Sequence, residues 1–287
     1  MTPVELLLRV VLLPAGVCAV AALLGWILAR RSPRARDVCL AVGVAVAFGA
    51  SLRAFDVRPD LPLKVSEDAW WWVVWFAAAG AVLGIVETLV RAPLALRVVL
   101  RAGAGFGAAW LLLKPLVPHA LAADLHLEEA AVAGVATAVL WSVLADETPR
   151  PSRLSLVLPL AVALPAAAAI LAVYGHAIVF AQALGALVVC VGTTAALALP
   201  RAGAPLLPAS VAPVVALVFV GMLTAAIGYL NFGDTVSFPR ASAVLLVASA
   251  GCASVRSWKS ALVLALLAAG AAAWFAYGHD VAGPSLE

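Results

Sequence analysis

The sequence predicts an all-α fold, a polytopic transmembrane helical bundle of about ten membrane-spanning helices. The 287-residue chain is 65% hydrophobic and 11% charged, with a mean hydropathy of +1.11. Soluble domains are about 45–50% apolar and about 25% charged. Apolar runs of helical length recur along the chain, and basic residues gather in every second connection between them. These features exclude an ordinary soluble enzyme and a disordered chain.

Ten apolar runs follow one another, each near the length that spans a bilayer. The first lacks a preceding basic segment and is too long for a signal-peptide core, so it is interpreted as a permanent helix. The expected helices are 4–29, 38–55, 69–90, 98–118, 130–145, 154–173, 177–199, 206–230, 241–255 and 261–277. The second, fifth and ninth are marginal in length. A bundle of eight helices with re-entrant segments is therefore the structural alternative.

The chain is expected to form a single integral membrane domain, 1–287. Its longest polar stretch is 56–68, and no Walker-type glycine loop occurs, so an ATP-hydrolysing domain is not expected. A five-plus-five arrangement with inverted halves, 1–148 and 149–287, is compatible with proline positions. Pro14 and Pro165 interrupt the first helix of each half, and Pro213 interrupts the eighth helix. These three prolines are candidate helix breaks of the kind that transporters use to build a midplane site.

The distribution of basic residues predicts the orientation of the bundle. Short connections on the cytoplasmic side of a membrane carry an excess of Lys and Arg. The first, third, fifth, seventh and ninth connections hold most of them, so this side is expected to be cytoplasmic and both termini periplasmic. These basic residues are Arg30, Arg31, Arg34, Arg36, Arg91, Arg97, Arg150, Arg153, Arg201, Arg256 and Lys259.

Aromatic residues support the same orientation. Trp and Tyr are enriched where a helix meets the membrane–water interface. The third helix opens on the expected outer side with four tryptophans, Trp70, Trp71, Trp72 and Trp75. They are interpreted as interface anchors, with an aromatic ligand platform as the alternative.

Ionisable residues inside apolar spans are functional candidates because burying a charge in lipid is costly. Glu87 and Arg101 each lie about one turn from the inner end of neighbouring helices, so they can pair across the hairpin. Glu87 can instead pair with Arg91 at i+4. Glu87 is the acidic residue that proton coupling would need, and Gln182 is the best uncharged candidate for a solute contact. The alternative for the Glu87 pair is a structural ion pair at the rim.

Two GxxxG patterns predict close helix packing. They are formed by Gly80 and Gly84 in the third helix, and by Gly103 and Gly107 in the fourth. We expect these two helices to pack on each other through the glycines, with a homodimer face as the alternative.

The residues for cofactor or metal chemistry are sparse. The connection 119–129 contains His119, His126 and three acidic residues, but their spacing matches no zinc signature. The four cysteines lie in apolar runs and have no CxxC spacing. No catalytic constellation lies within the spans, so we expect no enzyme, no cofactor and no metal site.

Ten helices in about 290 residues resemble the drug/metabolite exporter architecture. This resemblance covers length and helix number, and the expected outward termini depart from the inward ones of that family. The resemblance implies two inverted five-helix halves, and none of that family's helix-end motifs is present in this sequence.

The function predicted from the sequence is a multi-pass inner-membrane protein that acts as a small-solute or lipid permease. The alternative is a non-transporting structural subunit of a membrane complex. The expected partners are the lipid bilayer, other membrane subunits or a second copy of the chain, and not nucleic acid.

Overall fold

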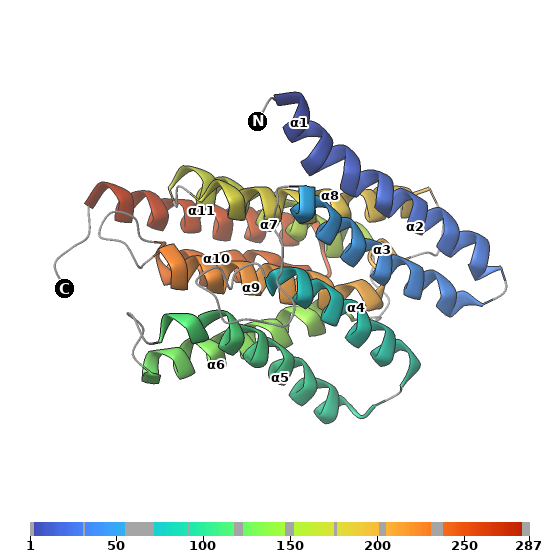
Figure 1. The fold of residues 1–287 in the computed structure, drawn as a ribbon, viewed down its shortest axis with the longest axis horizontal. Coiled ribbons are helices and arrows are strands. Elements are labelled where there is room, and N and C mark those ends of the chain that lie inside the picture. The colour runs from blue at the N-terminus through green and yellow to red at the C-terminus, as the bar shows by residue number, and fades with distance from the viewer. Residues whose placement is uncertain are drawn as a thin grey trace.

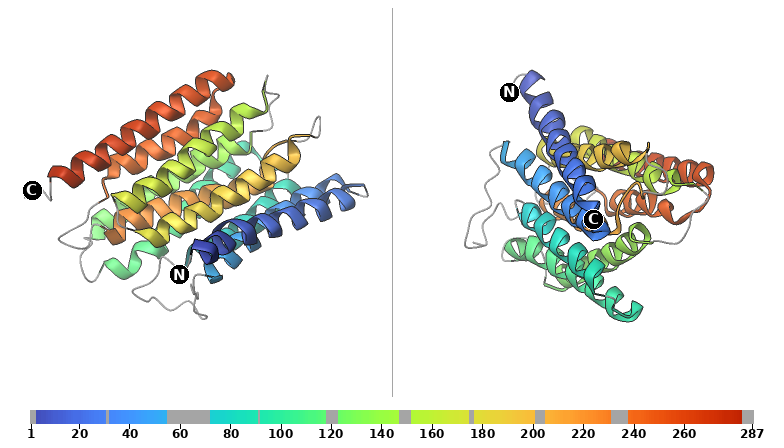
Figure 2. Two further views of the ribbon diagram at one scale, coloured as in Figure 1. Left: turned by 90° about the horizontal axis from the view of Figure 1, so that it is seen from above. Right: turned by 90° about the vertical axis from the view of Figure 1, so that its right-hand side faces the viewer.

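In a computed structural model, the chain folds into a bundle of ten helices, counted over the residues that the structure describes (Figure 1). Those residues are 3–30, 32–54, 72–90, 92–117, 123–146, 152–174, 177–200, 205–230 and 238–282. The helices run back and forth along the long axis of the molecule, and both chain ends lie toward the same end (Figure 2). The predicted all-α fold is confirmed.

The first helix is continuous but contains a π-helical segment. It consists of α1 (Pro3–Leu7), the π segment Leu8–Leu12 and α2 (Leu13–Ala29). The N–H of Leu13 donates to the carbonyl of Leu8, five residues back, and Pro14 follows with no N–H to donate. The irregularity expected at Pro14 is therefore a π turn beside the proline.

This π segment is held against the third element, α3 (Pro33–Ala54). The carbonyl of Arg9 lies opposite the proline that cannot donate, and the hydroxyl of Ser51 donates to it instead, at 2.8 Å. The guanidinium of Arg9 in turn donates to the carbonyl of Ala54 at 2.7 Å, at the end of α3. These bonds join α3 to the first helix.

The remaining helices follow in chain order. They are α4 (Val73–Leu89), α5 (Leu94–Leu113), α6 (Ala123–Leu144), α7 (Leu154–Val173), α8 (Ile178–Ala198), α9 (Ala212–Leu230), α10 (Arg240–Gly251) and α11 (Trp258–Ala282). Short 3-10 turns extend three of them: η3 (Lys114–Leu116) after α5, η4 (Ala209–Val211) before α9, and η5 (Cys252–Ser254) after α10.

Eight of the described helices are long and apolar enough to cross a membrane, which supports a multi-pass membrane protein; α4 and α10 are shorter apolar helices. The marginal length expected for the second and fifth helices is wrong. Helix α3 begins at Pro33 and α6 at Ala123, so each includes charged residues that were expected in connections. Both helices therefore reach 22 residues. The ninth helix, α10, is short, with 12 residues.

Helix α9 forms the centre of the bundle. Its residues are apolar on every side, and each one from Ala212 to Ala226 is buried. It contacts α4, α5, α6, α8 and α10. Because its surface is apolar all round, α9 can be enclosed by other helices without burying charged groups. Helices α2, α5 and α11 lie at the periphery and expose many large apolar side chains, as expected for surfaces that face lipid.

The prolines expected to break other helices lie within regular structure. Helix α7 stays helical through Pro165, and it also contains Pro159 without interruption. Pro213 lies in the first turn of α9, where a missing N–H costs no intrahelical bond. The five-plus-five arrangement stays a prediction. The first helices of the two halves have different neighbours: α2 packs mainly on α3 and α8, and α7 packs on α8, α10 and α11.

The expected packing of the two GxxxG helices on each other is wrong. Gly80 and Gly84 of α4 face η4 and α9 instead. A Cβ atom at Gly84 would lie 2.1 Å from the carbonyl oxygen of Ser210. Gly103 and Gly107 of α5 have no heavy atom within 4 Å of such a Cβ position. Helix α5 packs on α6 through Gly105, whose Cβ position is 2.5 Å from the side chain of Thr137.

Candidate functional site

The candidate site is built around Arg101 in α5. The buried residues of α5 recur at helical spacing and form one stripe, to which Arg101 belongs: Arg101, Gly105, Ala108, Ala109, Leu112 and Leu113. This stripe faces α6 and the centre of the bundle, so the backbone carries the guanidinium inward. Arg101 is 4% exposed, which makes it the most deeply buried charged side chain among the described residues.

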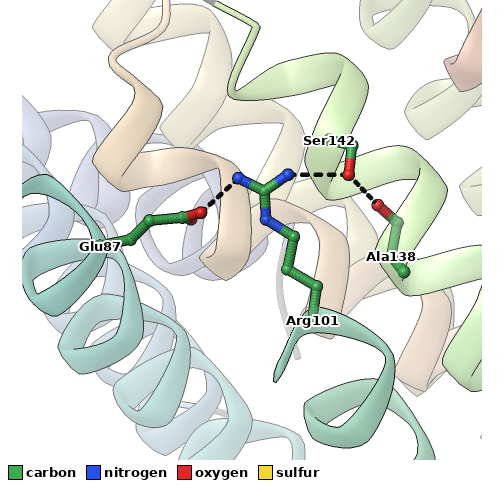
Figure 3. Close-up of polar contacts among 4 residues, drawn as sticks. All are labelled: Glu87, Arg101, Ala138 and Ser142. Atoms are coloured by element: carbon green, nitrogen blue, oxygen red, sulfur yellow. Dashed lines mark hydrogen bonds and ion pairs between the residues drawn. The ribbon is translucent and has the colours of Figure 1, made fainter. Parts of the chain in front are cut away.

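Three groups surround the guanidinium of Arg101, and two of them, Glu87 and Ser142, are drawn in Figure 3. Its Nη2 forms an ion pair with Oε1 of Glu87 in α4, and its Nη1 donates to the hydroxyl of Ser142 in α6 at 2.7 Å. The hydroxyl of Ser142 in turn donates a hydrogen bond to the carbonyl of Ala138, at 2.6 Å. The ring of Trp141 lies 5.4 Å from the guanidinium carbon, within cation–π range. Arg101 thus links α4, α5 and α6.

The predicted pairing of Glu87 and Arg101 across the hairpin is present. A buried charge that is paired and hydrogen-bonded costs far less than an isolated one. The pair is incomplete in one respect, because the buried Nε of Arg101 has no hydrogen-bond partner in the described part of the chain. The alternative partner of Glu87, Arg91, lies outside the described residues.

The Glu87–Arg101 pair forms part of the wall of a polar cavity with a volume of about 790 Å³. The cavity lies at the end of the bundle where α3, α5 and α9 begin and where α4 and α6 end, which we name the cavity end. Its walls carry charged and polar groups from four helices: Arg34, Asp37, Glu87, Thr88, Arg97, Arg101, Ser142 and Asp146. A volume of this size matches small-molecule sites.

Two other cavities of the described residues are chemically different. One is a groove of about 710 Å³ between α2 and α3, and the other, of about 420 Å³, is bounded by α6, α9 and α10. The first is lined wholly by apolar residues, and the second has only Glu129 and Thr224 as polar members. Neither groups opposite charges, so the polar cavity is the better candidate for recognising a solute.

The glycines of α4 shape the inner wall of the polar cavity. Because Gly84 has no side chain, η4 lies directly against α4, and Ala209 of η4 reaches the cavity. The hydroxyl of Ser210 donates to the carbonyl of Asp37 at 2.8 Å, which ties η4 to the first turns of α3. The wall is therefore fixed by a close approach of two backbones and by a hydrogen bond from a side chain to a backbone carbonyl.

Gln182 lies apart from this cavity, partly buried on α8, which does not contribute to the lining. The structure brings together Glu87 and Arg101 and leaves Gln182 elsewhere. Of the four expected interface tryptophans, Trp70 and Trp71 lie outside the described residues. Trp72 is buried in the hydrophobic core at 5% exposure, and Trp75 packs against the same core. The side chain of Trp72 is therefore too little exposed to act as the interface anchor that was expected.

The expected loop 119–129 is helical from Ala123, and His126 is buried rather than solvated. Its ring stacks on Trp110 of α5, with 4.0 Å between ring centroids, and its Nε2 lies 3.0 Å from the Trp110 carbonyl. The helical continuation toward the N-terminus of α6 turns this side chain into the α5–α6 interface. Among the described residues no group of three His, Cys, Asp or Glu side chains could hold a metal.

Sequence reasoning missed several residues of the cavity. Ser142 was not among the predicted residues, because a serine inside a helix can bond its own backbone and needs no other partner. It does so here while also accepting from Arg101. Arg34, Asp37, Arg97 and Asp146 were assigned to connections, since charge marks the end of an apolar run. The signal that could have found them is their shared placement at helix ends on one side of the membrane. No protein-family model, no curated protein and no solved structure matches this chain.

Proposed function

We propose that this protein is a small-solute permease of a bacterial inner membrane and that the polar cavity is its cytoplasmic vestibule. The observation that carries the proposal is the cavity of about 790 Å³ whose wall contains the buried Arg101 with its partly buried partners Glu87 and Ser142. Charged residues are costly to place inside a membrane, and a bundle that only packs would not need them. Those found within a membrane bundle therefore mark solute or ion pathways. A scaffold that only packs against partners needs no such cavity.

The orientation comes from the basic residues. The cavity end carries the arginine-rich connections of the chain, and such connections remain in the cytoplasm. With ten helices, both termini then lie on the periplasmic side. The vestibule would open to the cytoplasm in the conformation described here, and a second conformation would open it to the other side.

Glu87 and Arg101 are suited to control such a change. Their ion pair connects α4 to α5, and Arg101 connects onward to α6 through Ser142. Protonation of Glu87 would remove one charge of the pair and weaken the connection between α4 and α5. We therefore assign Glu87 to proton coupling and Arg101 to holding the inner ends of the three helices together. The role is transport, without a covalent step or a cofactor.

Uptake into proteoliposomes tests the proposal. The purified chain would be reconstituted and supplied in turn with radiolabelled succinate, phosphate, choline and glucose, under an imposed proton gradient. We expect saturable uptake of at least one of the four above protein-free liposomes, and loss of its dependence on the gradient in Glu87→Gln. Arg256→Gln is the matched control, since Arg256 is exposed and does not line the cavity.

Accessibility of the cavity provides a second measurement. Ala145 lines the cavity, so Ala145→Cys, in a chain whose native cysteines are replaced by serine, should react with a charged maleimide from the cytoplasmic side. Val263→Cys, on the exposed apolar face of α11, should stay unreactive in lipid. Absence of uptake together with an unreactive Ala145→Cys would instead favour a structural subunit.

A further inference from the structure

The charges that line the polar cavity are unevenly paired. Glu87 is paired with Arg101, and Asp37 has Arg36 beside it, 3.3 Å from Nη2 to Oδ1. Asp146 also has an interaction partner. Arg34 and Arg97 both line the cavity, and neither has a side-chain partner among the described residues. The lining therefore presents two cationic groups that the carboxylates of the cavity leave available.

Arg97 is the more informative of the two. It lies in the second turn of α5 and is half-buried, and its Nε is a buried donor without a hydrogen-bond partner in the described ranges. A buried donor left without an acceptor is unfavourable, because it has lost its hydrogen bonds to water. The Nε–H of Arg97 can therefore accommodate an acceptor from a bound ligand, since the surrounding protein provides none in the described ranges. A guanidinium binds carboxylate and phosphate oxygens in a bidentate manner, so its geometry selects an oxyanion.

The backbone adds to the same preference. Helices α3 and α5 both begin at the cavity end, and residues of their first turns, Arg34 and Leu94, line the cavity. The first N–H groups of a helix are unpaired and carry a partial positive charge. Two helix starts and two arginines thus surround a space large enough for a small organic anion.

We propose that the cavity binds an oxyanion, a carboxylate or a phosphate, between Arg34 and Arg97. This inference names the substrate class of the proposed permease and so rests on that proposal. The Glu87–Arg101 pair lies in the same cavity wall, where an anion that approaches Arg101 would compete with Glu87 for the guanidinium. The same chemistry occurs in a free organic anion and in the headgroup of an anionic lipid.

Binding to the purified full-length chain in detergent tests this inference independently of transport. Succinate and inorganic phosphate would be titrated at constant ionic strength, with thermal unfolding and calorimetry as measurements. We expect saturable stabilisation, weakened about tenfold or more in Arg97→Gln, since a hydrogen bond to a charged group contributes about 1.5–3 kcal/mol. Arg97→Lys keeps the charge and should retain part of the affinity. Arg256→Gln should bind like the wild type.

A lipid arm separates the two sources of the oxyanion. The same variants would be compared in phosphatidylcholine nanodiscs with and without phosphatidylglycerol. Stabilisation by soluble anions that depends on Arg97 supports a free anion as ligand. Stabilisation by phosphatidylglycerol alone, with the same dependence, supports the oxyanion site with a lipid headgroup in it. No saturable effect in either arm, or equal effects of Arg97→Gln and Arg256→Gln, would overturn the inference.

The outcomes also distinguish this inference from the permease proposal. Binding that depends on Arg97 without any uptake would support the oxyanion site and refute transport. Uptake of a solute that is unaffected by Arg97→Gln would leave transport standing and refute the site.

Discussion

Helices α4 and α5 carry the same GxxxG spacing but use it differently. In α4, Gly80 and Gly84 receive the backbone of η4 and the start of α9 at distances that no Cβ would allow. In α5, Gly103 and Gly107 face no neighbouring atom, and the contact with α6 is made through Gly105 between them. The GxxxG motif allows the backbone of another helix to approach closely. The arrangement of the surrounding helices determines whether one does so.

The largest effect is expected from Gly84→Ala. Its Cβ would lie 2.1 Å from the backbone oxygen of Ser210, and a backbone cannot rotate away as a side chain can. We expect a loss of about 3 kcal/mol or more in the free energy of unfolding, in the range of severe overpacking. Unfolding in a graded detergent mixture, followed by circular dichroism, would measure it. A loss below about 1 kcal/mol would show that η4 does not lie so close to α4.

Glu87→Gln should have the next largest effect. It leaves the guanidinium of Arg101 buried without its counter-charge, and removing one partner of a buried pair costs about 3–5 kcal/mol. Glu87 is 18% exposed and lines a polar cavity, so we expect about 2–3 kcal/mol here. The same unfolding assay would measure it. The double variant with Arg101→Gln should recover part of the loss, and a purely additive result would contradict direct pairing.

Gly105→Ala should destabilise the protein less than Gly84→Ala. The new methyl group would lie 2.5 Å from the Cβ and Oγ1 of Thr137, a less severe approach than the 2.1 Å to the Ser210 carbonyl oxygen at Gly84. We expect a loss of about 1–2 kcal/mol, within the usual range of overpacking. Adding Thr137→Gly should restore part of it, because that change removes the Cβ of Thr137 as well as its Oγ1 and Cγ2, which lie 2.5, 2.5 and 3.0 Å from the new methyl position. Failure of that double variant to recover stability would place the contact elsewhere on α6.

Gly103→Ala should have the smallest effect. The position is exposed and unobstructed, and alanine is favoured over glycine in a helix by about 0.8–1 kcal/mol. We expect no loss, or a gain of a few tenths of a kcal/mol. Chemical crosslinking in membranes would be run in parallel with Gly103→Leu. A loss of dimers in that variant would show that α5 uses its glycines against a second copy of the chain.

The architecture was largely predictable from sequence because lipid imposes it. Apolar length predicted ten helices, and the expected helix 154–173 matches α7 at both ends. The starts of α3 and α6 were wrong because charged residues were taken to end a span. In the structure these residues extend the helices beyond the apolar run, and helices do not have to stop where the hydrocarbon does.

The site was predictable only in part. Helix-end spacing predicted the Glu87–Arg101 pair, since two adjacent helices bring these residues to the same depth. The place of Ser142 beside them depends on which face α6 presents. The helices are apolar on all sides, so periodicity gives no indication of the face that packs inward. For the same reason, nothing in the sequence singles out α9 as the central helix.

The central position of α9 has a consequence for how this chain tolerates sequence change. At positions such as Val215 and Phe219, any added or removed carbon must be accommodated by other helices, which have little room to adjust. On the outward faces of α2 and α11 the neighbour is fluid hydrocarbon, which conforms to many shapes. The number of apolar replacements that a position tolerates should therefore increase with its distance from α9. The position of a helix in the sequence would not predict this tolerance.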